Sequence, residues 1–149
     1  MTIKNLHNLI LKDIDDKNAG KYRNENITIS GATHISPNHM VVVELIQKLL
    51  VEYNQQWENY HPVVKACLLH GEFVKIHPFI DRNGRTARLL LNFELMKRGY
   101  TPIIIKKKRR AEYYEALDLA HTTSEYSKFI ELVSQFVVES ELLWLRVIK

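Results

Sequence analysis

The stretch HPFIDRNGRTAR, residues 77–88, brings together side chains that suit the binding of a phosphate next to a proton acceptor. Arg85 and Arg88 are three residues apart, so on a helix both guanidinium groups lie on one face and can hold phosphate oxygens by forked hydrogen bonds. Asp81 supplies the carboxylate that a Mg²⁺ ion shared with phosphates requires. His77 is the group able to exchange a proton near neutral pH. The stretch therefore predicts a phosphate-handling site.

Two apolar helical patterns flank this stretch, one from Val63 to Ile76 and one from Ala87 to Met96. The stretch is thus expected to be the loop between two buried helices, with its last residues in the first turn of the second helix. The first N–H groups of a helix have no intrahelical partner and lie at the positive end of its dipole, where a phosphate binds well. Asn83 and Gly84 would let the backbone approach that phosphate closely.

The string resembles the signature of the Fic (filamentation induced by cAMP) domain family, HPFx(D/E)GNGRxxR. Ten of its twelve positions agree with the usual form HPFxDGNGRTGR when the variable fourth position is allowed. Ala87 replaces a common Gly and is acceptable because Ala is the better helix former. Arg82 replaces the usual Gly and adds a side chain and a charge to the anion-binding turn. Half of the motif alone would recur by chance, and the two later arginines alone would fit a solvated helix face.

The resemblance covers about residues 15–135 and implies an all-α fold, the Fic helical bundle with a short β-hairpin flap, as a single domain over residues 1–149. It also implies transfer of AMP from ATP to a Ser, Thr or Tyr hydroxyl of a target protein. His77 would be the general base, and Asp81 would hold Mg²⁺ and contact the nucleotide. The other motif residues implied to bind the nucleotide are Arg82, Asn83, Gly84, Arg85, Thr86 and Arg88.

Residues 26–35 alternate apolar and polar side chains around a Ser-Gly turn, which predicts a short β-hairpin. The resemblance identifies it as the flap beside the Fic active site, with AGKYR before it and a proline after it. Its exposed edge would pair with an extended segment of the target protein. Thr28, Ile29, Ser30 and Gly31 would then border the nucleotide. A plain structural hairpin is the alternative.

Tyr113 and Tyr114 lie on a predicted helix from Glu112 to Ala120, and their aromatic faces can stack on a purine. In similar Fic proteins the corresponding pair and a polar residue seven positions later border the adenosine, which implies a contact from His121. Packing of the two tyrosines against the preceding helix explains the same pattern.

Helical spacing predicts three further helices, and a proline signal gives the start of the helix that precedes residues 77–88. Their ranges are 3–14, 36–57 with Ser36 as N-cap and Pro37 at N1, 62–76 opened by His61-Pro62, and 124–147. Near the end of the last helix, Trp144 and Leu145 suggest a contact in a homodimer. His7 is interpreted as a surface or half-buried residue, and His70 as a helix-packing histidine rather than a zinc ligand.

The composition fits a soluble globular protein. The chain has 149 residues, 46% apolar and 26% charged, with no run of 18 apolar residues and no signal-peptide pattern, so neither membrane insertion nor secretion is expected. Its single Cys67 excludes an internal disulfide and fits a cytoplasmic location. The net charge of +4 comes largely from residues 106–110, a run more typical of a solvated stretch than of nucleic-acid binding.

Many Fic proteins carry an inhibitory helix, (S/T)xxxE(G/N), whose Glu pairs with the second motif arginine. Ser127 and Glu131 have this spacing, but Leu132 follows them and the stretch has the pattern of a core helix. The resemblance therefore implies an inhibitory segment or antitoxin partner outside this sequence, or another form of restraint. Arg88 would be available for the γ-phosphate.

Three other functions remain open. Within the family, the chain would remove AMP from a modified protein or transfer another phosphate-containing moiety. The kinase-like Doc relatives have a shorter motif, so the intact GRTAR argues against that chemistry. The third function is a catalytically silent adaptor that uses the basic run and the hairpin edge to bind protein or nucleic acid.

Overall fold

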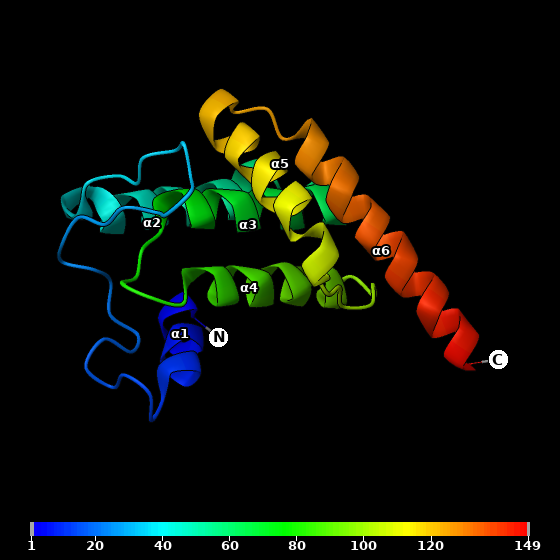
Figure 1. The fold of residues 1–149 in the computed structure, drawn as a ribbon, viewed down its shortest axis with the longest axis horizontal. Coiled ribbons are helices and arrows are strands. Elements are labelled where there is room, and N and C mark those ends of the chain that lie inside the picture. The colour runs from blue at the N-terminus through cyan, green and yellow to red at the C-terminus, as the bar shows by residue number, and fades with distance from the viewer. Residues whose placement is uncertain (1, 149) are drawn as a thin grey trace.

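The chain folds around one buried helix, α3, which lies at the centre of the helical arrangement in Figure 1. A computed structural model describes residues 2–148, and these form six α-helices with no β-strand among them. The helices are α1 (Ile3–Leu11), α2 (Val42–Val51), α3 (Pro62–Ile76), α4 (Asn83–Lys97), α5 (Arg110–Thr123) and α6 (Ser127–Ile148). Shorter helical turns span His39–Val41, Glu52–Gln56 and Lys107–Arg109. The all-α prediction is confirmed.

Helix α3 begins where its sequence predicts. The imidazole of His61 accepts a hydrogen bond from the N–H of Val63 (3.2 Å), and Pro62 occupies the first helical position, where its missing N–H costs nothing. Apolar residues then surround most of the helix, so it can pack on all sides. At Gly71 an added Cβ would lie 2.3 Å from the Tyr126 ring, so only Gly permits this approach between α3 and the start of α6.

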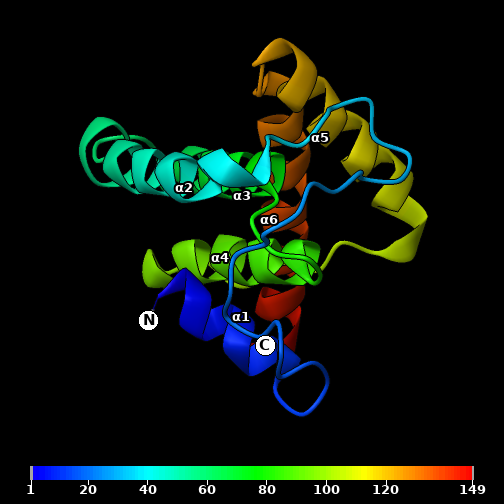
Figure 2. The ribbon, with the colours of Figure 1, turned by 90° about the vertical axis from the view of Figure 1, so that its left-hand side faces the viewer.

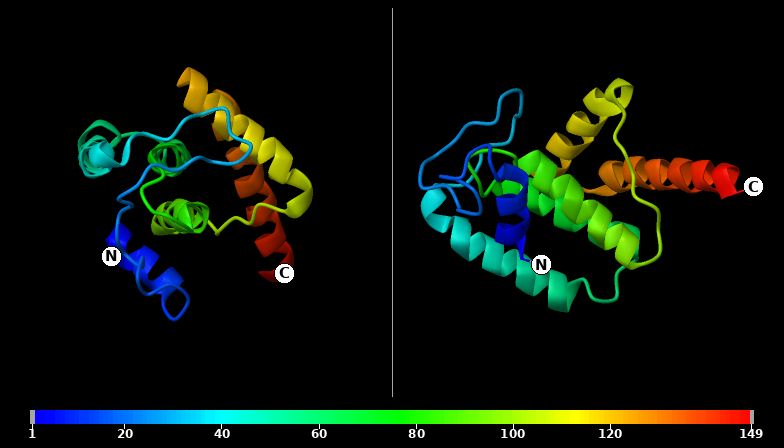
Figure 3. Two further views of the ribbon diagram at one scale, coloured as in Figure 1. Left: turned by 60° about the vertical axis from the view of Figure 1, so that its left-hand side comes forward. Right: turned by 90° about the horizontal axis from the view of Figure 1, so that it is seen from below.

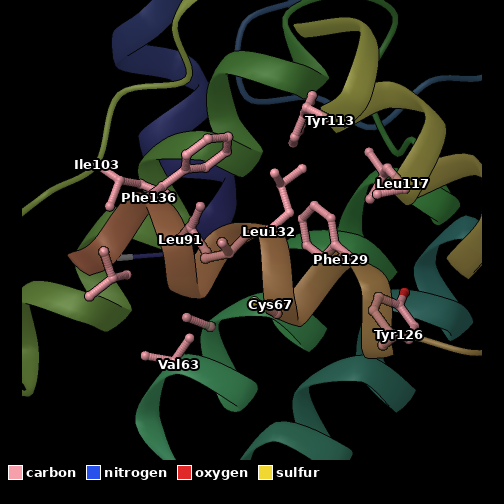
Figure 4. Packing of buried hydrophobic residues seen from close by; sticks show 14 of the residues in the cluster. Val63, Cys67, Leu91, Ile103, Tyr113, Leu117, Tyr126, Phe129, Leu132 and Phe136 are labelled. Atoms are coloured by element: carbon pink, nitrogen blue, oxygen red, sulfur yellow. The ribbon is translucent and has the colours of Figure 1, made fainter. Parts of the chain in front are cut away.

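Two apolar clusters meet on α3. The larger one joins α3 and α4 to α5 and α6, and Figure 4 shows Phe129, Leu132 and Phe136 of α6 reaching toward α3 and α4. The smaller cluster packs α2 against the other side of α3 and includes Phe79 from the loop that follows α3. Phe79 is fully buried, as expected for an apolar anchor of that loop. The loop between α3 and α4 is therefore fixed at one end of the core.

Helix α6 extends beyond the rest of the molecule, as the right-hand view of Figure 3 shows. Its buried residues lie in its first half, from Phe129 to Val137. Its second half exposes large apolar side chains, namely Val138, Leu142, Leu143, Trp144, Leu145, Val147 and Ile148. Trp144 and Leu145 are thus exposed, and the homodimer stays a prediction. None of the helices described has the length and apolarity that crossing a membrane requires.

The predicted β-hairpin at residues 26–35 is wrong. This stretch belongs to an irregular connection, which we call the 24–37 loop, without ladder hydrogen bonds between its two halves. Instead, a carboxylate oxygen of Asp118 on α5 accepts the N–H groups of Thr33 (3.0 Å) and His34 (3.1 Å). An isolated two-stranded hairpin is only marginally stable, so these bonds to α5 determine the local conformation.

Two predicted helix boundaries also differ. Helix α2 does not start at Ser36-Pro37, because the carbonyl of Pro37 accepts a hydrogen bond from Arg23 and Asn38 caps the following turn instead. Helix α1 ends at Leu11 rather than at residue 14, because Asp13 takes a positive φ of 62° that breaks the helix.

Candidate active site

His77 ends helix α3 in a left-handed conformation, with φ 52° and ψ 61°. Its Nδ1 atom lies 3.3 Å from the carbonyl oxygen of Val74, so Nδ1 carries the ring proton and Nε2 keeps its lone pair. Burial lowers the pKa of His77, and the nearby charge of Arg23 lowers it further. The imidazole is therefore neutral near pH 7 and can accept a proton.

Asp81 and Arg82 form an ion pair at the tip of the loop. Their Oδ2 and Nε atoms lie 3.4 Å apart, and the Asp81 side chain is 62% exposed. Arg82 adopts φ 63°, a left-handed conformation that Gly takes without strain and other residues rarely take. The guanidinium thus lies beside the carboxylate predicted to bind Mg²⁺.

The residues present fit a Mg²⁺ ion that binds together with phosphates. Among residues 2–148 no group of three or more His, Cys, Asp and Glu side chains could hold a metal. Mg²⁺ does not need such a group, because one or two carboxylates suffice when phosphates and water supply the other ligands. The exposed carboxylate of Asp81 meets that requirement, with Arg82 as a competing cation.

Asn83 and Thr86 hold the loop instead of pointing toward solvent. The Asn83 amide is buried and bonds both the N–H (2.9 Å) and the carbonyl (2.8 Å) of Phe79. The Thr86 hydroxyl donates to the carbonyl of Arg82 (2.9 Å). Both side chains are engaged, so a bound phosphate would meet the backbone N–H of Asn83 rather than its amide.

The start of α4 is open to an anion. Its N-cap residue, Arg82, makes no side-chain capping bond, and no partner was found within residues 2–148 for the first N–H groups of the helix. A Cβ added at Gly84 would lie 3.3 Å from Nη1 of Arg88, so the Arg88 guanidinium lies against this first turn. Arg85 is exposed, and neither Arg85 nor Arg88 forms an ion pair among the described residues.

The 24–37 loop runs from the α3–α4 connection to α5 and back, as Figure 2 shows. One residue of the loop contacts the last turn of α3: the Nε2–H of His34 donates to the carbonyl of Lys75 (3.0 Å). After His34 the loop leads to α2. The predicted nucleotide-bordering residues occupy its outer turn. They are the exposed Thr28, Ser30 and Gly31 and the half-buried Ile29.

The tyrosine pair has one buried and one exposed member. Tyr113 is 2% exposed and its hydroxyl lies 2.5 Å from Nε2 of His70, so it is a core residue. Tyr114 is 57% exposed and is the member whose ring face a purine could reach. His121 is buried, and its Nε2–H donates to the carbonyl of Gly71 (2.8 Å). The prediction that His70 is a packing residue is confirmed, because it is fully buried against α5 and α6.

Two residues that hold the loop were missed by the sequence analysis. His7 of α1 is fully buried, not on the surface, and its ring stacks on Phe79 with 3.6 Å between ring centroids. Its Nδ1 accepts from the N–H of Gly20 (3.0 Å), so Nε2 carries the proton and donates it to the carbonyl of Asp81 (2.8 Å). Arg23 is the second residue, with four hydrogen bonds to carbonyl oxygens. Only the AGKYR string drew attention to Arg23, and it indicated no contact.

Residues 1–95 match the profile of the Fic/DOC family. The chain belongs to the Fic/DOC family. Among curated Fic relatives, the protein adenylyltransferase Fic of Drosophila mojavensis is 41% identical over 120 residues, covering 80% of this chain and 24% of the relative. The Drosophila melanogaster protein of the same name is 40% identical over 125 residues, covering 81% and 25%. The chain thus spans about a quarter of the length of these relatives.

Solved Fic structures share the fold. Fic-1 (residues 134–508) of C. elegans superposes with a TM-score of 0.86 at 30% identity, over 99% of this chain and 44% of that one. A Fic family protein of Desulfovibrio desulfuricans G20 gives 0.83 at 26% identity, over 98% and 47%. The Fic fold is therefore present in the residues described, although the predicted flap strands are not.

Proposed function

We propose that this chain is a protein adenylyltransferase, which transfers AMP from ATP to a Ser, Thr or Tyr hydroxyl of a target protein. The loop between α3 and α4 carries the proposal, because it begins at His77, a neutral proton acceptor, and ends at an uncapped helix N-terminus six residues later. The curated Drosophila relatives named protein adenylyltransferase, at about 40% identity, support the same chemistry.

The triphosphate binds along the first turn of α4. The backbone N–H groups at Asn83 and Gly84 receive the α- and β-phosphate oxygens, because they lack intrahelical partners and lie at the positive end of the helix. Arg85 holds the departing pyrophosphate, and Arg88 the γ-phosphate. Asp81 would hold Mg²⁺, which would neutralise charge on the phosphates. Tyr114 offers its exposed ring to the adenine.

The transfer is an in-line displacement at the α-phosphorus. The target hydroxyl oxygen forms a bond to that phosphorus, and the bond from phosphorus to the oxygen bridging to the β-phosphate breaks. The electron pair of the broken bond leaves with pyrophosphate. Nε2 of His77 takes the hydroxyl proton, since Nδ1 is already protonated and bonded to Val74. The product is a phosphodiester between AMP and the target side chain.

Target presentation is assigned to the 24–37 loop. The N–H groups of residues 27–31 have no backbone partner among the described residues, so an extended target segment could pair with them without displacing a strand. The proposal includes an inhibitory partner that pairs with Arg88, because Arg88 forms no ion pair within residues 2–148.

Labelled ATP tests the proposed transfer. The chain is incubated with cell extract and ATP carrying the label on either the α- or the γ-phosphate. Protein labelled from the α position, and not from the γ position, supports AMP transfer. His77→Ala should reduce that label at least about 10²-fold because the base is lost. His39→Ala removes an imidazole that makes no side-chain hydrogen bond among the described residues, and it should transfer normally.

Three other outcomes would redirect the proposal. Label from the γ position would indicate kinase-type transfer. Release of AMP from a pre-labelled protein, dependent on His77, would indicate hydrolytic removal of AMP, in which water replaces the target hydroxyl at the phosphorus. The Arg82–Asp81 ion pair favours a binding-only adaptor as the second candidate, because it occupies the carboxylate predicted to hold Mg²⁺. An isothermal titration without saturable binding of Mg²⁺–ATP would favour that adaptor.

A further inference from the structure

Arg23 is a buried arginine whose partners are all main-chain groups. Arg23 is only 4% exposed, and no carboxylate among residues 2–148 forms an ion pair with its guanidinium. Burial without an anionic partner is costly for a guanidinium and lowers the pKa of Arg23. A buried guanidinium is stable when several hydrogen-bond acceptors replace the water molecules that it loses on burial.

The carbonyl oxygens around Arg23 come from two separate parts of the chain. Nε donates to His77 (2.7 Å), and Nη2 donates to Ile76 at a longer 3.3 Å. The same Nη2 donates to Pro37 (2.6 Å), and Nη1 donates to Glu25 (3.1 Å). One planar group therefore joins both ends of the 24–37 loop to the last turn of α3.

The backbone of Arg23 strengthens this connection. Its N–H donates to the carbonyl of Pro78 (2.8 Å), the residue that follows the proposed base. His77 needs such support because a φ of 52° is disfavoured for a residue with a side chain. The main chain of Arg23 thus contacts the residue after His77, and its side chain contacts the main-chain carbonyl of His77 itself.

Only arginine can make this set of bonds. Its five N–H donors lie in one plane at fixed angles, so Nε and the two Nη atoms can address three directions at once. A lysine carries all its donors on one nitrogen atom, so it cannot donate to the carbonyls of both Pro37 and His77 from the positions that Nη2 and Nε of Arg23 occupy. The fork, rather than the charge alone, is the feature that couples the two segments.

We propose that Arg23 is a positioning residue that sets the orientation of His77 and the opening of the 24–37 loop together. The catalytic part of this inference rests on the proposed function, in which His77 is the base and the loop receives the target. The coupling of loop and imidazole does not depend on that function. A displacement of the base by about 1 Å costs about 10²-fold in rate, so a residue outside the reacting atoms can control transfer.

The test compares Arg23→Gln and Arg23→Lys with Arg98→Gln, which removes one positive charge from an exposed position on the surface. Three quantities are measured: amide hydrogen exchange along the chain, the pKa of the His77 imidazole by NMR, and kcat and KM for AMP transfer. The Lys variant keeps the charge and loses the fork, so it separates the two. If the Gln variant does not fold, the Lys variant alone still tests the inference.

Both Arg23 variants should show at least tenfold faster exchange at the hydrogen-bonded amides of the loop, which are those of Ala32, Thr33 and His34, with exchange in α6 unchanged. The pKa of His77 should rise in Arg23→Gln, because a neighbouring positive charge is removed. For transfer, kcat should fall about 10²-fold while KM for ATP changes little. Arg98→Gln should match the wild type in all three measurements.

Two results would overturn the inference. The first is an Arg23→Lys variant that equals the wild type in exchange, His77 pKa and kcat. The second is faster exchange throughout the chain, in α6 as much as in the loop, which would show a merely structural role. A wild-type chain that transfers no AMP would contradict the proposed function alone, because exchange and NMR would still decide whether Arg23 couples the loop to His77.

Discussion

The ring of His7 donates a hydrogen bond to the main-chain carbonyl of Asp81, 74 residues further along the chain, at 2.8 Å. The same ring accepts the N–H of Gly20 and stacks on Phe79. Helix α1 therefore fixes the position of the loop between α3 and α4, which carries the proposed metal ligand Asp81. The contact involves the backbone carbonyl of Asp81, so His7 does not occupy the carboxylate, which pairs with Arg82 instead.

Replacing His7 by Phe should keep the stacking on Phe79 and remove both hydrogen bonds. Each buried group left without a partner costs about 1–3 kcal/mol, so we expect the free energy of unfolding to fall by about 2–5 kcal/mol. Denaturant unfolding of the variant measures this fall. His39→Phe provides the control, since the ring of His39 makes no hydrogen bond within residues 2–148. Equal unfolding midpoints for His7→Phe and wild type would contradict the role of His7.

Replacing Arg82 should separate strain from charge. Arg82→Gly relieves the strain of the positive φ and should raise the free energy of unfolding by up to about 1 kcal/mol. Arg82→Ala keeps that strain, so its free energy of unfolding should not rise. Both variants remove the cation beside Asp81, so both should bind Mn²⁺–ATP severalfold more tightly. Unfolding curves and a titration followed by Mn²⁺ electron paramagnetic resonance test the two effects. Unchanged Mn²⁺–ATP affinity in both would show that Arg82 does not compete for Asp81.

Gly84→Ala should weaken nucleotide binding without destabilising the fold. Its Cβ would stand 3.3 Å from Nη1 of Arg88, a movable side chain, and Ala favours a helix by up to about 1 kcal/mol. The same Cβ enters the space where the phosphate meets the backbone, so affinity for ATP should fall at least tenfold. Isothermal titration and thermal unfolding measure the two properties.

Gly71→Ala is the matched control for that variant. Here the Cβ would lie 2.3 Å from the ring of Tyr126 inside the core, so overpacking should lower the free energy of unfolding by about 1–3 kcal/mol. A Gly84→Ala variant that loses as much stability as Gly71→Ala would contradict an open first turn in α4.

Acid should destabilise the fold through two buried histidines. Burial lowers the pKa of His70 and of His121 from 6.5 to about 4 in each case. On acidification the two histidines are therefore protonated near pH 6.5 in the unfolded chain but only near pH 4 in the folded chain. The stability that they contribute above pH 6.5 is lost as the pH falls from 6.5 to 4. We expect each histidine to contribute up to about 3 kcal/mol to this loss.

Urea unfolding at pH 7.5, 6, 5 and 4.5 measures the loss. His70→Gln removes one titrating group, so its stability should depend less steeply on pH than that of the wild type, even though its stability at pH 7.5 is lower. Identical slopes for the two proteins would show that His70 is not responsible.

Local patterns were sufficient for the parts of the site that lie within one stretch of sequence. His61-Pro62 predicted the start of α3, and the apolar spacing on both sides of residues 77–88 predicted a loop between two buried helices. The positive φ of Arg82 also explains why the family pattern usually has Gly there. Each of these features depends on residues within a few positions of one another.

Contacts between distant residues could not be predicted in the same way. The 24–37 loop looked like a hairpin because its residues alternate, but its shape depends on Asp118 of α5 and on Arg23. The sequence suggests a surface or half-buried His7, because nothing near it in the chain indicates its partner Asp81, which is 74 residues away. A single sequence carries no signal for such pairs.

The apolar second half of α6 determines how the isolated chain behaves in concentrated solution. Leu142, Trp144 and Leu145 are each about half exposed. Leu142 and Leu145 are three residues apart and share one side of the helix, whereas Trp144 lies on another side, so no rotation of α6 hides them all from water. Attraction between the exposed apolar surfaces of folded molecules, rather than unfolding, will limit the solubility of the protein. Detergent or a polar substitution in this half should raise that limit without changing the melting temperature.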